Sequence, residues 1–140
     1  MISLSRPPRL FQVAVAAQPS CAAGVRRMVA AHLRLWRLPH LVDDTVLATG
    51  ELFANAVRHA STDPSDTVGV TLEYSGDRLR VTLADSSSVQ PRPRTPDAGA
   101  ETGRGLSIVE ALADDWGTDP PGPGDIGKTV WFSMDVRGTT

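Results

Sequence analysis

An acid and an amide stand four residues apart in the otherwise apolar stretch of residues 51–60. They are Glu51 and Asn55, and residues at positions i and i+4 of a helix lie one above the other. An amide oxygen can ligate Mg²⁺ without adding charge, and a neighbouring carboxylate can accept a proton. A solvated helix face opposite a core-facing stripe would show the same pattern. The pair therefore indicates a site only if other parts of the chain supply matching residues.

Three later segments supply them. Asp85 ends an alternating strand, Gly103 and Gly105 precede an apolar helical pattern, and Gly127 opens the final strand. A carboxylate at the end of a buried strand needs a donor, which is either a ligand amino group or the serine-rich turn that follows. Glycines before a helix either let unpaired backbone N–H groups approach phosphate oxygens or simply begin the helix. Together the segments favour a nucleotide site.

In order and spacing, these segments resemble the GHKL superfamily of ATP-binding domains, which includes DNA gyrase and the histidine kinases. The likeness is greatest to its short single-domain members, the anti-sigma-factor serine/threonine kinases, and extends from about residue 11 to residue 136. The fold that this resemblance implies is α/β, a two-layer α/β sandwich of the Bergerat type. Its mixed sheet would carry the helices on one face.

The resemblance also implies roles for single residues. Glu51 would be the general base, Asn55 would bind Mg²⁺, and Asp85 would accept a hydrogen bond from the adenine amino group. Arg58 and Arg104 would contact phosphate, although Arg58 could simply end its helix and Arg104 could face solvent. The residues implied to bind ATP are Asn55, Arg58, Asp85, Gly103, Arg104, Gly105, Leu106 and Thr129.

One departure from the family pattern follows Asp85. The adenine box of the family reads Asp-x-Gly-x-Gly, whereas residues 86–89 here are Ser-Ser-Ser-Val. Since both glycines are missing, the backbone is expected to approach the adenine less closely.

The elements that must position these residues follow from periodicity and turn signals. Strands are predicted over residues 10–17, 67–74, 78–84 and 128–136, with a short segment around Trp116. Helices are predicted over residues 19–38, 41–60 and 105–113, and Trp131 and Phe132 are expected to pack in the core. The polar, proline-rich residues 86–102 have no apolar period and occupy the position of the family's ATP lid. All 140 residues are interpreted as one ATP-binding domain.

The composition of the chain argues against two kinds of binding partner, nucleic acid and membrane. The net charge of −2 provides no basic face for direct nucleic-acid binding, and no apolar run approaches the length of a membrane span. The single cysteine, Cys21, excludes an internal disulfide. A cytoplasmic protein is therefore expected.

The function predicted from the resemblance is that of an ATP-binding regulatory protein. It would phosphorylate a serine or threonine of an anti-sigma-factor antagonist protein and sequester a sigma factor, with ATP and Mg²⁺ as cofactors and a homodimer as its assembly. The alternative is a noncatalytic, nucleotide-gated protein-binding module of the same fold. A histidine-kinase fragment is less favoured, because the chain has no helical segment left to carry a phosphoacceptor histidine. P-loop and dinucleotide-binding folds are excluded, since a Walker A sequence and the third glycine of the dinucleotide motif are both missing.

Overall fold

A computed structural model describes residues 7–59, 65–85, 106–119 and 128–137. Within these residues, five strands form one sheet in the order β1-β2-β3-β5-β4. Their bounds are β1 Arg9–Ala16, β2 Thr67–Ser75, β3 Arg78–Asp85, β4 Asp115–Asp119 and β5 Thr129–Asp135. The strands lie close to their predicted positions, and the short segment around Trp116 is strand β4.

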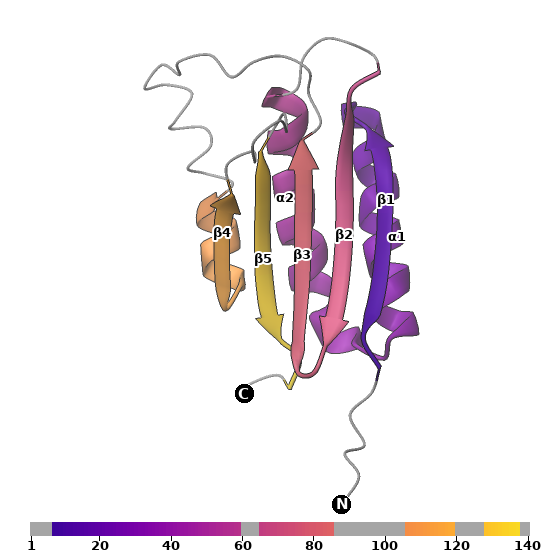
Figure 1. Cartoon of the computed structure of the whole chain (residues 1–140), viewed down its shortest axis with the longest axis vertical. Coiled ribbons are helices and arrows are strands. Elements are labelled where there is room, and N and C mark those ends of the chain that lie inside the picture. The colour runs from indigo at the N-terminus through magenta and orange to yellow at the C-terminus, as the bar shows by residue number, and fades with distance from the viewer. Residues whose placement is uncertain (1–6, 60–64, 86–105, 120–127, 138–140) are drawn as a thin grey trace, which may run out of the picture.

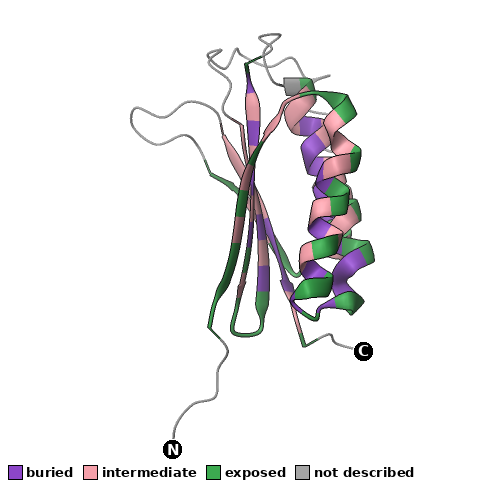
Figure 2. Cartoon of the chain, turned by 90° about the vertical axis from the view of Figure 1, so that its right-hand side faces the viewer, coloured by how far each residue is buried: buried purple, intermediate pink, exposed green. Residues whose placement is uncertain are grey.

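Two long helices cover one face of this sheet. Helix α1 (Ala22–Leu35) and helix α2 (Val42–His59) are each preceded by one 3-10 turn, η1 (Pro19–Cys21) and η2 (Pro39–Leu41). Figure 2 shows both helices on the same side of the sheet. Residues 106–112 are also helical. The predicted two-layer α/β sandwich with helices on one face is thus confirmed. No helix within the described ranges is both long and apolar enough to span a membrane.

The prediction of a mixed sheet is wrong, because all four strand pairings among the described residues are antiparallel. Two helices connect β1 to β2, one running back along the sheet and the other forward. The chain therefore enters β2 at the end of the sheet where β1 finished, and β2 runs antiparallel to β1. Strands β3 and β4 do point in the same direction (Figure 1), but β5 lies between them. The insertion of β5 removes the parallel pair that a single intervening helix would otherwise produce.

The core lies between the helices and the sheet. Alternate residues of β2 and β3 face it, as the period of two in a strand requires. On the helix side, Val29 and Phe53 are almost wholly buried, 1% and 0% exposed. Burying one such side chain contributes roughly 1.5–3 kcal/mol. The buried apolar strand residues are Val68, Val70, Leu72, Leu79, Val81, Leu83, Phe132 and Met134.

The other face of the sheet carries no helix in the described part of the chain, and Trp131 lies on it. Phe132 faces the core and is 0% exposed, so its neighbour Trp131 must point the opposite way. The Arg80 guanidinium lies 4.2 Å from the centroid of the Trp131 ring, and Gly117 of β4 leaves room beside that ring. The prediction that both aromatic residues pack the core is therefore correct for Phe132 and wrong for Trp131.

Candidate functional site

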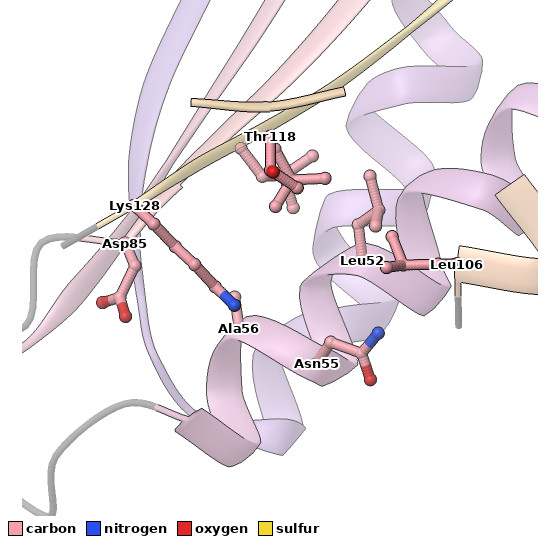
Figure 3. Close-up of a pocket in the computed structure, with 9 residues that line it drawn as sticks. Leu52, Asn55, Ala56, Asp85, Leu106, Thr118 and Lys128 are labelled. Carbon is pink, nitrogen blue, oxygen red and sulfur yellow. The ribbon is translucent and has the colours of Figure 1, made fainter. Parts of the chain in front are cut away.

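A pocket opens between helix α2 and one end of the sheet (Figure 3). Helix α2, the ends of β3 and β5, strand β4 and the helical residues 106–112 each contribute to its wall. We call it the α2–β5 pocket. Its lining residues are Leu52, Asn55, Ala56, Leu83, Asp85, Leu106, Thr118, Lys128 and Val130. Five of these nine side chains are apolar, and the polar ones are few and of different types. Pockets that hold small ligands commonly combine apolar walls with a few orienting polar groups.

Asn55, the amide residue identified in the sequence as a candidate Mg²⁺ ligand, lines this pocket. Asn55 is only 7% exposed, so the alternative interpretation, a solvated helix face, does not apply to it. Asn55 is buried in the wall of the α2–β5 pocket, not in the hydrophobic core. The amide oxygen Oδ1 accepts a hydrogen bond from the guanidinium of Arg58, one turn further along α2. Arg58 itself is exposed and does not line the pocket in the described part of the chain.

Glu51 stands one turn before Asn55 on α2 and is half-buried. It is not among the residues that line the pocket within the described ranges. The structure thus places the predicted acid and amide on adjacent turns of one helix, as their spacing requires, but brings only the amide into the pocket wall.

Asp85 is the last residue of β3 and lines the pocket. Its backbone N–H donates to the carbonyl oxygen of Lys128 at 2.9 Å, which extends the pairing between β3 and β5 by one residue. This backbone contact fixes Asp85 and Lys128 next to each other at one end of the pocket. A half-buried carboxylate therefore faces a site with largely apolar walls.

The remaining predicted ATP contacts divide into three groups. Leu106 lines the pocket. Thr129 begins β5, where alternation turns it away from the face that carries Val130, and the described pocket wall does not include it. Gly103, Arg104 and Gly105 lie outside the described residues, as does the predicted lid at residues 86–102.

Comparison with known proteins decides the family. A family model described as the histidine kinase-like ATPase domain matches residues 15–134. The chain belongs to this family. The predicted resemblance to GHKL-type ATP-binding domains is therefore confirmed, and ATP is the nucleotide for which a histidine kinase-like ATPase domain is named. A search of curated proteins found no match.

A solved structure shares the fold of this histidine kinase-like ATPase domain. It is the crystal structure of the RsbU and RsbW domains of Rv1364c from Mycobacterium tuberculosis, with a TM-score of 0.66 and 21% sequence identity. The alignment covers 93% of this chain and 32% of that one, so this chain spans about a third of the length of the solved protein. At this identity, the likeness shows a common fold.

Sequence reasoning missed several residues that line the pocket of this ATPase domain. Leu52, Leu83 and Val130 were recognised only as apolar positions of their elements, and Thr118 lies in a strand too short to show a clear period. Lys128 was interpreted as the start of a strand. A signal for Lys128 was nevertheless present, because it is the only lysine in the chain.

Proposed function

We propose that this domain binds ATP with Mg²⁺, transfers the γ-phosphoryl group to a serine or threonine of an antagonist protein, and sequesters a sigma factor. The observation that carries the proposal is the α2–β5 pocket, in which Asp85, Asn55 and apolar walls meet. Membership of the ATPase family supports the nucleotide. The sequence resemblance to anti-sigma-factor kinases, together with the fold shared with a structure that contains an RsbW domain, supports the protein substrate and the sigma partner.

The residues of the pocket fit an adenine nucleotide. Leu83, Leu106 and Val130 offer apolar surface to a flat base. Asp85 offers an acceptor for an exocyclic amino group, because an ionised carboxylate accepts hydrogen bonds through both of its oxygens. At the α2 end of the pocket, the Asn55 amide oxygen is a ligand of the kind that Mg²⁺ accepts, and it would hold the ion that neutralises phosphate charge.

Glu51 is the proposed general base. A serine hydroxyl is a weak nucleophile at neutral pH, so a carboxylate within hydrogen-bond reach assists phosphoryl transfer. The base acts on the hydroxyl of the protein substrate and not on the adenine. Glu51 lies one helical turn from Asn55 and outside the pocket wall that would hold adenine, which is consistent with that role.

One observation favours the alternative, a nucleotide-gated binding module without kinase activity. The Arg58 guanidinium donates to Asn55 Oδ1, the atom that a Mg²⁺ ligand would have to offer. If this contact persists in the nucleotide complex, the metal loses its protein ligand, and phosphoryl transfer loses the ion that neutralises the developing charge.

The role of Asp85 is tested by comparing ATP with inosine triphosphate, whose base carries an oxygen in place of the amino group. A carboxylate accepts from the amino group but repels the oxygen, so wild type should prefer ATP by roughly tenfold or more. Asp85→Asn should reverse or remove this preference, because an amide can donate to the oxygen. Calorimetric titration of both nucleotides into both proteins measures this. Equal affinity of the wild type for the two nucleotides would refute adenine recognition by Asp85.

A further inference from the structure

Lys128 is the only lysine among the 140 residues, whereas arginine occurs thirteen times. Every other lysine or arginine position is thus an arginine, and the single lysine ammonium group belongs to a residue in the wall of the α2–β5 pocket. Arginine and lysine are not equivalent, because the guanidinium is a planar fork and the ammonium a compact point charge. The position of the only lysine in this pocket therefore points to a ligand group that binds a compact positive charge.

Backbone pairing and side-chain direction fix where this charge lies. The carbonyl oxygen of Lys128 accepts from the Asp85 N–H at 2.9 Å, so the two residues start from the same end of the pocket. From there the Lys128 side chain extends across the pocket toward Ala56 of α2 (Figure 3). Ala56 follows Asn55 directly in the helix. The ammonium group therefore lies between the carboxylate proposed to hold adenine and the amide proposed to bind Mg²⁺.

The nucleotide that fits this pocket has its own charge in the same place. With adenine at Asp85 and the β- and γ-phosphates near Asn55, the ribose and the α-phosphate would lie between them. Lys128 is the only cationic side chain among the residues known to line the pocket in the described part of the chain. An ammonium group binds a phosphate oxygen as a point charge, and such a charge-assisted hydrogen bond is stronger than one between neutral groups.

We propose that Lys128 is a nucleotide-binding residue that pairs its ammonium group with the α-phosphate of the bound nucleotide. The proposal rests on the proposed function, since it requires the α2–β5 pocket to hold an adenine nucleotide. It predicts that the protein distinguishes a nucleotide from a nucleoside even before the β- and γ-phosphates are present.

Binding of adenosine, AMP, ADP and ATP to the wild type and to Lys128→Met tests the proposal. Methionine keeps most of the apolar stem and removes the charge. The variant should bind AMP, ADP and ATP roughly tenfold or more weakly, while its affinity for adenosine stays unchanged. Arg27→Met is the matched control, because it removes an exposed cation from α1, away from the pocket wall, and should leave all four affinities unchanged.

The outcomes separate this proposal from the proposed function. If Lys128→Met loses affinity for adenosine as much as for AMP, the residue acts as a wall of the pocket and the phosphate contact is refuted. Unchanged AMP affinity in a folded variant refutes it as well. If the wild type binds none of the four compounds, the nucleotide site itself fails and the proposal fails with it.

Covalent labelling provides a second readout. Periodate-oxidised ATP carries two aldehydes on its ribose, and each can condense with an amine to an imine with loss of water. Borohydride then reduces the imine to a stable secondary amine. Because Lys128 carries the only ε-amino group of the chain, mass spectrometry should find the adduct on the peptide that contains it, and unmodified ATP should suppress the labelling. Labelling confined to the α-amino group, or insensitive to ATP, would overturn the assignment.

Discussion

The Arg58 guanidinium donates a hydrogen bond to the Asn55 amide oxygen, so the two proposed ATP-binding residues contact each other. In a Mg²⁺–ATP complex, the metal would take the Asn55 oxygen and the guanidinium would be released next to the phosphates. Both residues were assigned to the ATP site from the sequence, but their hydrogen bond to each other was not foreseen. Residues three apart on a helix are neighbours, so the i, i+3 spacing permits this bond without requiring it.

Replacing Arg58 with alanine distinguishes between two roles for this residue. Either Arg58 binds phosphate, or it only competes with Mg²⁺ for the Asn55 amide oxygen. We predict that Arg58→Ala binds Mg²⁺–ATP roughly tenfold more weakly than wild type, because a charge-assisted contact to phosphate is lost. Without Mg²⁺, the guanidinium stays on Asn55 and the two proteins should bind ATP alike. Calorimetry with and without Mg²⁺ gives both values. Tighter Mg²⁺–ATP binding by the variant would mean that Arg58 only competes with the metal.

At the scale of elements, the end of α1 holds a residue in an unfavourable conformation. Arg37 follows the helix with a φ of 64°, the left-handed region that favours glycine. The Leu38 N–H donates to the Leu33 carbonyl at 2.7 Å and the Arg37 N–H to the Arg34 carbonyl at 3.0 Å, which is the Schellman pattern.

Arg37→Gly should therefore raise the free energy of unfolding by about 1 kcal/mol, since glycine adopts this conformation without steric cost. Urea denaturation followed by circular dichroism measures the change. Arg27→Gly is the control, because it replaces an exposed arginine in the middle of the helix and should lower stability by about 1 kcal/mol. A loss of stability in Arg37→Gly would show that the arginine side chain matters more than its backbone angle.

The contact between β4 and β5 depends on the absence of a side chain at Gly117. A Cβ atom there would lie 2.8 Å from Cζ2 of Trp131, which is closer than such atoms approach. The Arg80 guanidinium lies over the same ring, 4.2 Å from its centroid. We predict that Gly117→Ala lowers the free energy of unfolding by about 1–3 kcal/mol. In the background of Trp131→Ala the same substitution should cost much less, and an equal cost in both backgrounds would exclude the clash as the cause.

The sequence predicted elements better than it predicted the contacts between them. Alternation in residues 67–84 was enough to predict two strands and their hairpin, because period-two patterns reflect burial on one face. The direction of neighbouring strands was not predictable in the same way, since the position of β5 between β3 and β4 depends on long-range pairing. The position of Lys128 in the pocket was not predictable for the same reason. It depends on the backbone hydrogen bond between Lys128 and Asp85, two residues that are far apart in the sequence, and no local pattern carries that information.

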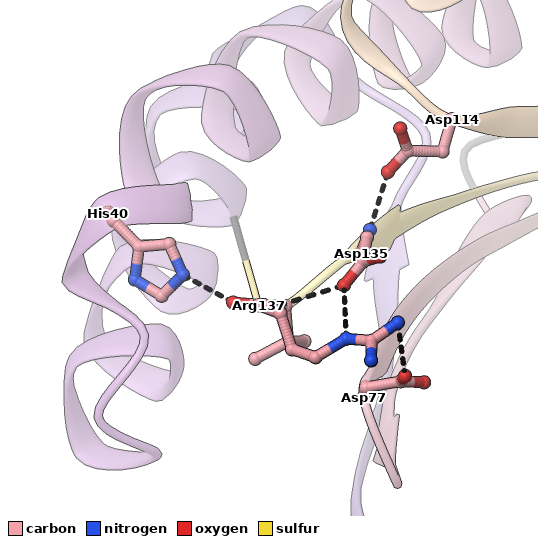
Figure 4. A network of polar contacts seen from close by, with 6 residues as sticks. His40, Asp77, Asp114, Asp135 and Arg137 are labelled. Carbon is pink, nitrogen blue, oxygen red and sulfur yellow. Dashed lines mark hydrogen bonds and ion pairs between the residues drawn. The ribbon is translucent and has the colours of Figure 1, made fainter. Parts of the chain in front are cut away.

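At the scale of the whole molecule, a polar network ties the C-terminal end of β5 to three distant segments (Figure 4). The Asp135 N–H donates to Asp114 Oδ2 at 2.5 Å, and the Arg137 guanidinium pairs with Asp77 in the β2–β3 turn at 3.0 Å. His40 donates from Nε2 to the carbonyl oxygen of Val136 at 2.6 Å, which connects η2 to the strand. The network holds both layers of the sandwich at the end opposite the α2–β5 pocket.

Asp135 gives this network a pH dependence. The backbone N–H of Arg137 donates to its carboxylate and is the main cause that lowers the pKa of Asp135 below its ordinary value of 3.8, with the Arg137 side chain adding to the effect and partial burial opposing it. Because the folded-state pKa is the lower one, the stabilisation is complete above pH 3.8 and is lost as the pH falls through the folded-state pKa.

A carboxyl titration followed by NMR should find the pKa of Asp135 below its ordinary value in the wild type and still below it in Arg137→Ala. The variant retains the backbone donor, which is the larger cause, and loses only the side-chain contribution. Titration of Asp135 at its ordinary value in Arg137→Ala would assign the whole effect to the guanidinium.

We propose that this histidine kinase-like ATPase domain is a protein kinase whose general base is Glu51. The most direct measurement is the transfer of radiolabelled γ-phosphate from ATP to the protein partners that co-purify with the domain. We predict that the wild type transfers phosphate and that Glu51→Gln does so roughly 10²–10⁴ times more slowly, because the proton acceptor is lost while size and hydrogen-bonding capacity are kept. Asp44→Asn, which removes an exposed acid from the first turn of the same helix, should transfer phosphate like the wild type. A wild-type protein that binds ATP and its partner but transfers no phosphate would contradict the kinase proposal and favour the nucleotide-gated binding module in its place.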